Sequence, residues 1–191
     1  MFLRISDKSI SEFLDNIATK PGTPAGGSIA ALCAAASAAL MEMVARHSLN
    51  NKNKPGEIKS YMEEVIQIAS SSRIKFLDYM DIDTKAYKNL INAQKNNDEH
   101  IEEYHKVSVN IPLEMANDLL KILEIINRTT KIGSGALVTD GVAALLMAKT
   151  TLNSIIYHVK FNLMYIKDKD FIEDIKTEIQ FIEEILKENI N

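Results

Sequence analysis

Asp83 is the acidic residue whose position most favours acid/base chemistry. If the surrounding segment is helical, Asp83 lies on an apolar and aromatic face with Phe76, Tyr79, Met80, Ala86, Tyr87 and Leu90. Burial disfavours the charged form of a carboxyl group, so we expect the pKa of Asp83 to be raised toward the range useful for general acid/base catalysis. On the residues alone, a buried aspartate that only hydrogen-bonds a tyrosine or a helix end is an equally good interpretation. Asp81, by contrast, has Lys85 one turn away and is expected on the solvated face.

A glycine cluster that precedes an alanine-rich segment is a candidate binding site. Residues 24–28 read Pro-Ala-Gly-Gly-Ser. Glycines let the backbone approach a ligand closely, and a helix start offers free N–H groups and the positive end of its dipole. Gly26, Gly27 and Ser28 could therefore hold an anionic or carbonyl-bearing ligand. The pattern is neither a Walker loop nor a dinucleotide fingerprint, and a tight turn followed by a helix cap is the simpler explanation.

Two further polar positions could contribute to a site. Asp140 follows the glycine-containing loop 133–135 and is either a second carboxylate of the site or only the cap of the next helix. Asn162 falls on one helical stripe with His158 and could either hydrogen-bond a substrate or join two helices. Both interpretations of each residue stay open on the sequence alone.

The histidines and the cysteine show no metal-binding pattern. Glu102 and His105 form one Glu-x-x-His step, whereas a di-iron bundle needs two such steps and two more inward-facing glutamates. Cys33 is the only cysteine, so an internal disulfide framework and a cysteine-cluster metal site are both excluded. We therefore predict that the protein needs no metal.

Long tracts without helix breakers must position these residues, and they indicate an all-α protein. No glycine lies between Gly56 and Gly133, and neither glycine nor proline follows Gly141. The expected helices cover residues 9–19, 28–49, 56–95, 98–128, 139–167 and 170–189, with Ser9, Ser28, Asp98 and Thr139 or Asp140 as caps. The sequence thus predicts an antiparallel multi-helix bundle.

Breaks and loops in this scheme are expected at specific places. The third helix could break near Asp81, and Pro112 should kink or break the fourth. The loops most suited to carry function are residues 50–57 and 129–140, because binding and catalytic groups concentrate on loops.

Length and composition fit one all-helical domain spanning residues 1–191. The chain is 46% hydrophobic and 25% charged, so it has the core-forming residues that disordered chains lack. Its net charge of −4 gives no sign of a nucleic-acid or anionic-membrane partner. The uncharged apolar run after Gly27 stops at Glu42 and is judged too short and too alanine-rich to span a bilayer. No signal-peptide pattern is present, and we predict a cytoplasmic protein.

The alanine-rich segment, residues 25–45, indicates how the helices pack and whether the protein forms a dimer. Residues 25–45 contain nine alanines. Small side chains let neighbouring helices approach closely, so this segment is expected to be the central helix of the bundle. A single layer of other helices could leave part of it uncovered, and we therefore expect a homodimer formed through helices.

Several short motifs follow one another in a distinctive order. They are Ser11-Glu12-Phe13-Leu14, the Pro-Ala-Gly-Gly-Ser of residues 24–28, Met43-Val44-Ala45, Asp83-Thr84-Lys85-Ala86-Tyr87, Ile111-Pro112-Leu113, Thr139-Asp140 and His158-Val159-Lys160-Phe161-Asn162. Together, over about residues 9–163, they resemble the cyclodeaminase/cyclohydrolase family of folate enzymes. That family includes the C-terminal domain of formiminotransferase-cyclodeaminase and stand-alone methenyltetrahydrofolate cyclohydrolases. The chain departs from the family pattern at Ala25, where the family has glycine, at His158, where it has asparagine, and in the loop after Leu49.

The resemblance implies a dimerising helical bundle that acts on a one-carbon derivative of tetrahydrofolate. It implies that Asp83 is the catalytic acid/base. It also implies the substrate-binding residues Gly26, Gly27, Ser28, Tyr87, Asp140, His158 and Asn162. Neither a metal nor a redox cofactor is implied. A polyglutamate tail on the folate would need a basic patch, for which Arg46, Lys149 and Lys160 are candidates.

Three activities fit this resemblance. The first, which we predict, is the cyclodeaminase reaction, in which 5-formimidoyltetrahydrofolate closes to 5,10-methenyltetrahydrofolate and releases ammonia. The alternative is the cyclohydrolase reaction, in which 5,10-methenyltetrahydrofolate takes up water and opens to the 10-formyl compound. A second alternative is a helical interaction protein that has kept the fold and lost the chemistry, which Ala25 and His158 would favour. No residue of the sequence chooses between the first two.

Overall fold

The computed structural model describes residues 4–19 and 25–188, and these form helices joined by short turns. The α-helices are α1 (Ile10–Thr19), α2 (Gly26–Leu49), α3 (Gly56–Lys95), α4 (Ile101–Ile132), α5 (Val138–Leu163) and α6 (Lys169–Glu188), and two short 3-10 helices, η1 (Ile5–Asp7) and η2 (Gly135–Leu137), precede α1 and α5. No strand occurs among the described residues. The all-α class predicted from the sequence is confirmed.

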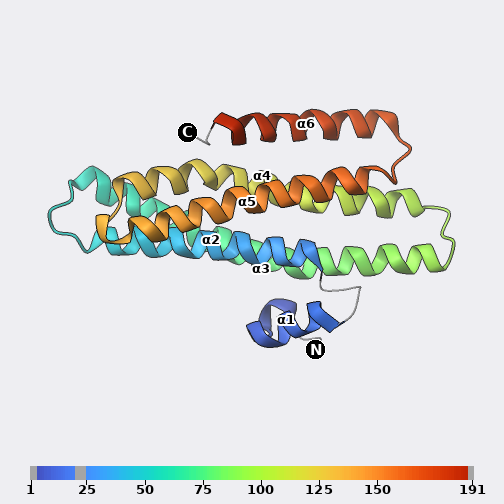
Figure 1. Ribbon diagram of the computed structural model, residues 1–191, viewed down its shortest axis with the longest axis horizontal. Helices are drawn as coiled ribbons and strands as arrows, with labels where there is room; N and C mark the ends of the chain where they lie inside the picture. Colours follow the sequence, from blue (N-terminus) through green and yellow to red (C-terminus); the bar gives the residue numbers. More distant parts are fainter. Residues whose placement is uncertain (1–3, 20–24, 189–191) are drawn as a thin grey trace.

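Helices α2 to α5 form an antiparallel bundle, because each reverses the direction of the one before it (Figure 1). Each of these helices packs against both of its neighbours around the bundle. Helix α6 runs along the outside of this bundle beside α5, and α1 lies on the opposite side (Figure 1). The start of α2, the second half of α3, the start of α4 and the end of α5 therefore meet at one end of the molecule.

Helix α2 is the central helix, as its composition predicted. Ala31, Ala34, Ala38 and Ala45 are fully buried, and no residue from Gly27 to Glu42 is classed as exposed. Small side chains allow α3 and α5 to approach closely, and Ser37 Oγ donates a 2.8 Å hydrogen bond to the Ala144 carbonyl of α5. One chain thus already covers most of α2, so the argument that α2 needs a second copy to cover it does not hold.

Two described segments, Gly26–Leu49 and Gly135–Leu163, are long and apolar enough to cross a membrane by length and composition alone. The sequence-based statement that the first is too short is corrected here, because the helix continues past Glu42 to Leu49. Of its most apolar window 61% is buried within the bundle, as in a core helix, against 28% for the second segment. The absence of a membrane partner stays a prediction.

Helix α3 shows no break at Asp81 and runs without interruption from Gly56 to Lys95. Asp81 is not paired with Lys85 as predicted. Its carboxylate instead accepts hydrogen bonds from the Ile5 amide at 2.6 Å and from Ser6 Oγ at 3.1 Å. Asp81 has these partners because η1 packs against this part of α3 and brings backbone N–H groups that need an acceptor.

Helix α4 likewise runs through Pro112 without the predicted break. Proline has no N–H, so the carbonyl of Ser108, four residues earlier, loses its partner within the helix. The side chain of Asn162 on α5 takes that place, with Nδ2 donating to the Ser108 carbonyl at 2.7 Å. A neighbouring helix therefore satisfies the group that the proline frees.

The predicted helix caps are partly corrected. Ser9 Oγ accepts from the Glu12 amide at 3.2 Å, as predicted for α1. Helix α2, however, begins at Gly26, so Ser28 lies within its first turn, and Asp140 likewise lies within the first turn of α5. Helix α4 begins at Ile101 rather than at residue 98, and α5 ends at Leu163 rather than at residue 167.

Candidate functional site

A cavity of about 580 Å³ opens where α2, α3, α4 and α5 meet. Its lining is mostly apolar and includes Ala30, Leu90, Ile111 and Met115. This volume and character are typical of pockets that bind small organic molecules. Asp83 is the only carboxyl group among the described residues that line it.

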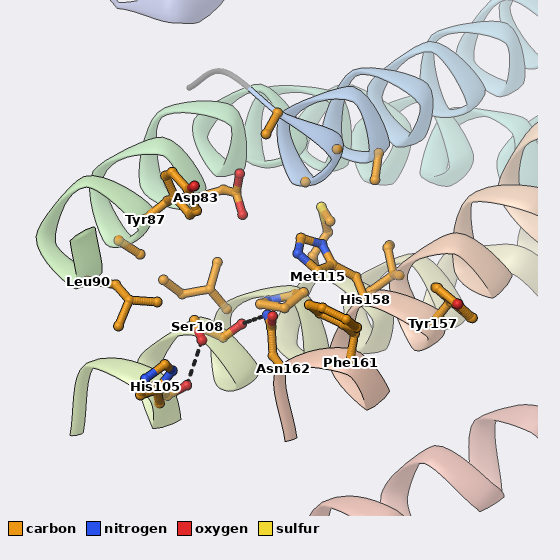
Figure 2. Close-up of a pocket in the computed structure, with 18 of the residues that line it drawn as sticks. Asp83, Tyr87, Leu90, His105, Ser108, Met115, Tyr157, His158, Phe161 and Asn162 are labelled. Atoms are coloured by element: carbon orange, nitrogen blue, oxygen red, sulfur yellow. Dashed lines mark hydrogen bonds between the residues drawn. The ribbon is translucent and has the colours of Figure 1, made fainter. Parts of the chain in front are cut away.

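Asp83 projects from α3 into this cavity, toward the start of α2 (Figure 2). Burial raises the pKa of its carboxyl group, as the apolar face of α3 predicted. The charge of His158 and the hydroxyl and backbone amide of Ser28 act against this rise, because they stabilise the ionised form. Asp83 thus has the environment expected of a group that both accepts and donates a proton.

Gly27 allows the carboxylate of Asp83 to lie directly against α2. A Cβ atom on Gly27 would lie 2.3 Å from Asp83 Oδ1 and 2.6 Å from Oδ2, far closer than any real contact. A Cβ on Gly26, by contrast, would meet nothing within 4 Å, and Gly26 lines the open cavity. The glycine cluster was expected to let a ligand approach the backbone. At Gly27 the group that approaches the backbone is the side chain of Asp83.

Ser28 lies behind Asp83 and does not line the cavity, so the structure does not bring it to the face expected of a substrate-binding residue. It is fully buried. Its hydroxyl lies 3.1 Å from Thr84 Oγ1, 3.3 Å from the Met80 carbonyl and 3.4 Å from Asp83 Oδ2. The anion that occupies the start of α2 is therefore the carboxylate of Asp83, which Ser28 helps to hold.

Helix α5 supplies His158 and Asn162 to the cavity, and α3 supplies Tyr87 (Figure 2). The Asn162 side chain donates one N–H to the Ser108 carbonyl, which realises the helix-joining interpretation and leaves the second N–H and the amide oxygen for a ligand. Tyr87 is 39% exposed at the cavity. The structure thus brings Gly26, Gly27, Tyr87, His158 and Asn162 together around Asp83.

Four aromatic residues of the cavity were missed by the sequence analysis. His105 stacks on Tyr165 with ring centroids 5.2 Å apart, and Phe161 meets Tyr165 edge-on at 5.9 Å. Burial lowers the pKa of His105. Tyr157, Phe161 and Tyr165 are spaced four residues apart, and this spacing was the signal that could have revealed a shared face. Planar side chains at a cavity suit a flat, conjugated ligand.

Asp140 lies outside this cavity. It belongs to the first turn of α5, while His158 lies eighteen residues further along the same helix, or about 27 Å at the rise of an α-helix. Within one chain Asp140 therefore does not lie beside Asp83 as expected, because α5 runs along the bundle and carries its first turn away from the cavity.

The two loops that were expected to carry function also lie away from the cavity. None of residues 50–57 or 129–140 lines it. These loops have a structural use instead, since Lys54 Nζ donates to the carbonyls of Ile132 and Gly133 at 2.7 and 2.8 Å and caps the end of α4. Helix faces and not these loops line the cavity, and a functional role of the loops stays a prediction.

The basic residues suggested for a glutamate tail do not line the cavity either. Arg46 pairs with Glu42, and Lys160 pairs with Glu183 at 2.6 Å. Lys149 lies on α5 beside α6, in a separate small groove. Among the described residues, no group of three or more His, Cys, Asp or Glu side chains is placed to hold a metal ion.

Comparison with known proteins identifies the architecture around this cavity. The model of the formiminotransferase-cyclodeaminase family matches residues 9–181. The chain belongs to this family. It is 26% identical over 184 residues to a methenyltetrahydrofolate cyclohydrolase of Methylorubrum extorquens, a match that covers 91% of this chain and 88% of that protein.

Two further proteins extend the comparison. The chain is 24% identical over 179 residues to formimidoyltransferase-cyclodeaminase of Rattus norvegicus, covering 88% of this chain but only about a third (32%) of the rat protein. The crystal structure of a formiminotetrahydrofolate cyclodeaminase from Thermotoga maritima matches with a TM-score of 0.90 and 22% identity, covering 96% of this chain and 92% of the other. This last likeness shows a shared fold. The family resemblance read from the motifs is confirmed.

Proposed function

We propose that this protein is a folate one-carbon enzyme that cyclises 5-formimidoyltetrahydrofolate to 5,10-methenyltetrahydrofolate and releases ammonia. Membership of the formiminotransferase-cyclodeaminase family supports the substrate class. The observation that carries the proposal is Asp83, the one described carboxylate of an apolar cavity, held in place by α2 and with a raised pKa. A carboxyl group whose pKa is raised by burial is better suited than an exposed one to donate a proton as well as to accept it.

The chemistry requires a group that moves protons between nitrogen atoms. N10 attacks the formimidoyl carbon, and Asp83 accepts the proton that N10 loses. The tetrahedral carbon then expels its amino group as ammonia and becomes the methenyl bridge between N5 and N10. No electron changes hands in this sequence, so the reaction needs no redox cofactor. We propose that it needs no metal either, because Asp83 accepts the proton of N10 directly.

A cyclohydrolase is the alternative, and one observation favours it. The cyclohydrolase of M. extorquens is 26% identical to this chain, whereas the rat and Thermotoga proteins named as cyclodeaminases are 24% and 22% identical. In this reaction water attacks the methenyl carbon, Asp83 takes a proton from the water, and the bond between that carbon and N5 breaks. Both reactions pass through a tetrahedral carbon between N5 and N10, so one site can serve either.

The direct test uses both folates with wild-type protein and Asp83→Asn. Methenyl absorbance rises with 5-formimidoyltetrahydrofolate for a cyclodeaminase, and falls faster than the uncatalysed rate with 5,10-methenyltetrahydrofolate for a cyclohydrolase. Asp83→Asn should keep the circular-dichroism spectrum and lower turnover about 10²–10⁴-fold, the usual size of acid/base catalysis. Unchanged absorbance with both folates leaves a non-catalytic bundle protein, and near wild-type turnover of the variant removes Asp83 from the mechanism.

A homodimer and a cytoplasmic location belong to the same proposal. Their support is the family membership and a bundle whose charged residues lie mostly on its surface. Light scattering and cell fractionation test them separately.

A further inference from the structure

His158 is a cavity residue whose position no hydrogen bond or ion pair among the described residues explains. It is half-buried and lines the cavity, yet its imidazole makes no hydrogen bond or ion pair with any described residue. The other histidine of the cavity, His105, is occupied by its stack on Tyr165. A half-buried imidazole with both ring nitrogens unused is available to a bound molecule.

The position of His158 relative to Asp83 is the second observation. The two side chains project from α5 and α3 toward each other across the cavity (Figure 2). They are close enough to interact electrostatically, since the charge of His158 favours the ionised form of Asp83. A bound substrate would lie between an acid and a base carried by different helices.

We propose that His158 is a second catalytic residue, the proton donor that works opposite the base Asp83. This inference rests on the proposed function and assigns to His158 the protonation of the departing amino group, while Asp83 accepts the proton from N10. An imidazole can carry and give up a proton, which a side-chain amide or an aliphatic group at this position could not do.

The proton balance of the cyclodeaminase reaction fits such a pair. The substrate enters as its amidinium cation, with Asp83 ionised and His158 protonated. N10 forms its bond to the amidinium carbon, whose C=N electron pair moves onto the exocyclic nitrogen, and the N10 proton passes to Asp83. His158 then protonates the amino group, the C–N bond breaks, and ammonia leaves with that electron pair. Transfer of the proton from Asp83 to His158 restores both groups, so the cycle neither consumes nor releases a proton.

The titratable groups that surround His158 are limited in number. From every helix that lines the cavity, the described titratable residues are Asp83, Tyr87, His105, Tyr157 and Tyr165, and no lysine, arginine or glutamate is among them. A change in the pH profile on substitution of His158 can therefore be assigned without interference from a lysine, arginine or glutamate in the cavity.

The experiment measures kcat/KM against pH for wild type, His158→Asn and His158→Gln, with His47→Asn as control. His47 lies on α2, exposed, near the opposite end of the bundle. We expect the two His158 variants to lose the alkaline limb and about 10²-fold or more in kcat, while the control keeps the wild-type profile. Variants that keep both limbs and a kcat within about threefold of wild type overturn the assignment while the proposed function stands.

A measurement that needs no turnover tests the role of His158 separately from the proposed function. In His158→Asn the pKa of Asp83, followed by carbon NMR of its carboxyl group, should rise above the wild-type value because an opposing positive charge is removed. An unchanged pKa shows that the two groups do not face each other as a pair, and the inference then fails. Wild-type protein without turnover on either folate removes the proposed function and this role together.

Discussion

Asp83 experiences two opposing effects, and their balance sets both reactivity and stability. Burial raises its pKa, while His158 and Ser28 favour its ionised form. The folded protein therefore binds this proton more tightly than the unfolded chain does. It follows that the ionised carboxylate costs folding free energy at pH values above its folded-state pKa, and that this cost disappears as the pH falls below the unfolded-state value.

Asp83→Asn should therefore be more stable than wild type near neutral pH. A gain of about 1 kcal/mol would raise Tm by about 2–4 °C in a chain of this size. The difference in Tm should shrink as the pH approaches about 4, where the wild-type carboxyl group is protonated as well. Thermal unfolding followed by circular dichroism across this range measures it, and a variant less stable than wild type at pH 7 contradicts the sign.

Gly27→Ala tests the close approach of Asp83 to α2. The added methyl group would overlap the carboxylate, and the short aspartate side chain must turn away because the helix backbone is less free to move. Displacement of a catalytic group by about 1 Å can cost on the order of 10²-fold in turnover. We expect that loss with helix content unchanged, measured by the methenyl assay and by circular dichroism.

Gly56→Ala is the matched control for this substitution. It also lies at a helix start, and a Cβ there meets nothing within 4 Å. Equal turnover of the two variants would show that the space at Gly27 does not matter for Asp83.

At the scale of the helices, Pro112 and Asn162 depend on each other. The proline frees the Ser108 carbonyl of α4, and the asparagine of α5 satisfies it at 2.7 Å. Asn162→Ala leaves this carbonyl without that partner and should lower the free energy of unfolding by about 1–3 kcal/mol. In a Pro112→Ala background the cost should be smaller, because the alanine amide can restore the hydrogen bond within the helix.

Urea unfolding of the wild type, the two single variants and the double variant gives the coupling energy directly. In this double-mutant cycle the packing lost on replacing Pro112 affects both variants that carry the replacement, and so it cancels from the coupling energy. If Asn162→Ala lowers the free energy of unfolding equally in both backgrounds, the hydrogen bond from Asn162 does not compensate for the proline.

At the scale of the whole molecule, α5 carries the apolar surface that α2 was expected to expose. Leu146 and Tyr157 of α5 and Met164, which directly follows the helix, are 59%, 76% and 76% exposed. Large apolar side chains exposed in a row are typical of contact surfaces between subunits. The predicted homodimer is therefore better placed on α5 than on α2.

Leu146→Glu should shift the protein toward a monomer, because it places a charge on one of the exposed apolar residues of this face. Size-exclusion chromatography with light scattering measures the change. Ile74→Glu, a matched change at an exposed residue of α3, should leave the mass unchanged. A monomeric wild type, or a Leu146→Glu variant of unchanged mass, rejects this interface.

The sequence alone determined the features that depend on local pattern. The absence of breakers gave long helices, and the spacing around Asp83 placed its carboxyl group on an apolar face, which was enough to predict a raised pKa. The order of the short motifs along the chain was enough to predict membership of the cyclodeaminase/cyclohydrolase family. These features depend on neighbours within a few turns of one helix, and so they can be read along the chain.

Only the tertiary structure decided which residues meet Asp83. Gly27, His158 and Asn162 come from helices far apart in the sequence, and the direction in which each helix runs determines which end reaches the cavity. The same packing took Asp140 and both loops to the other end of the bundle, and it supplied the Asn162 amide that lets α4 continue through Pro112. These outcomes depend on contacts between helices, which the helical period of a single segment does not specify.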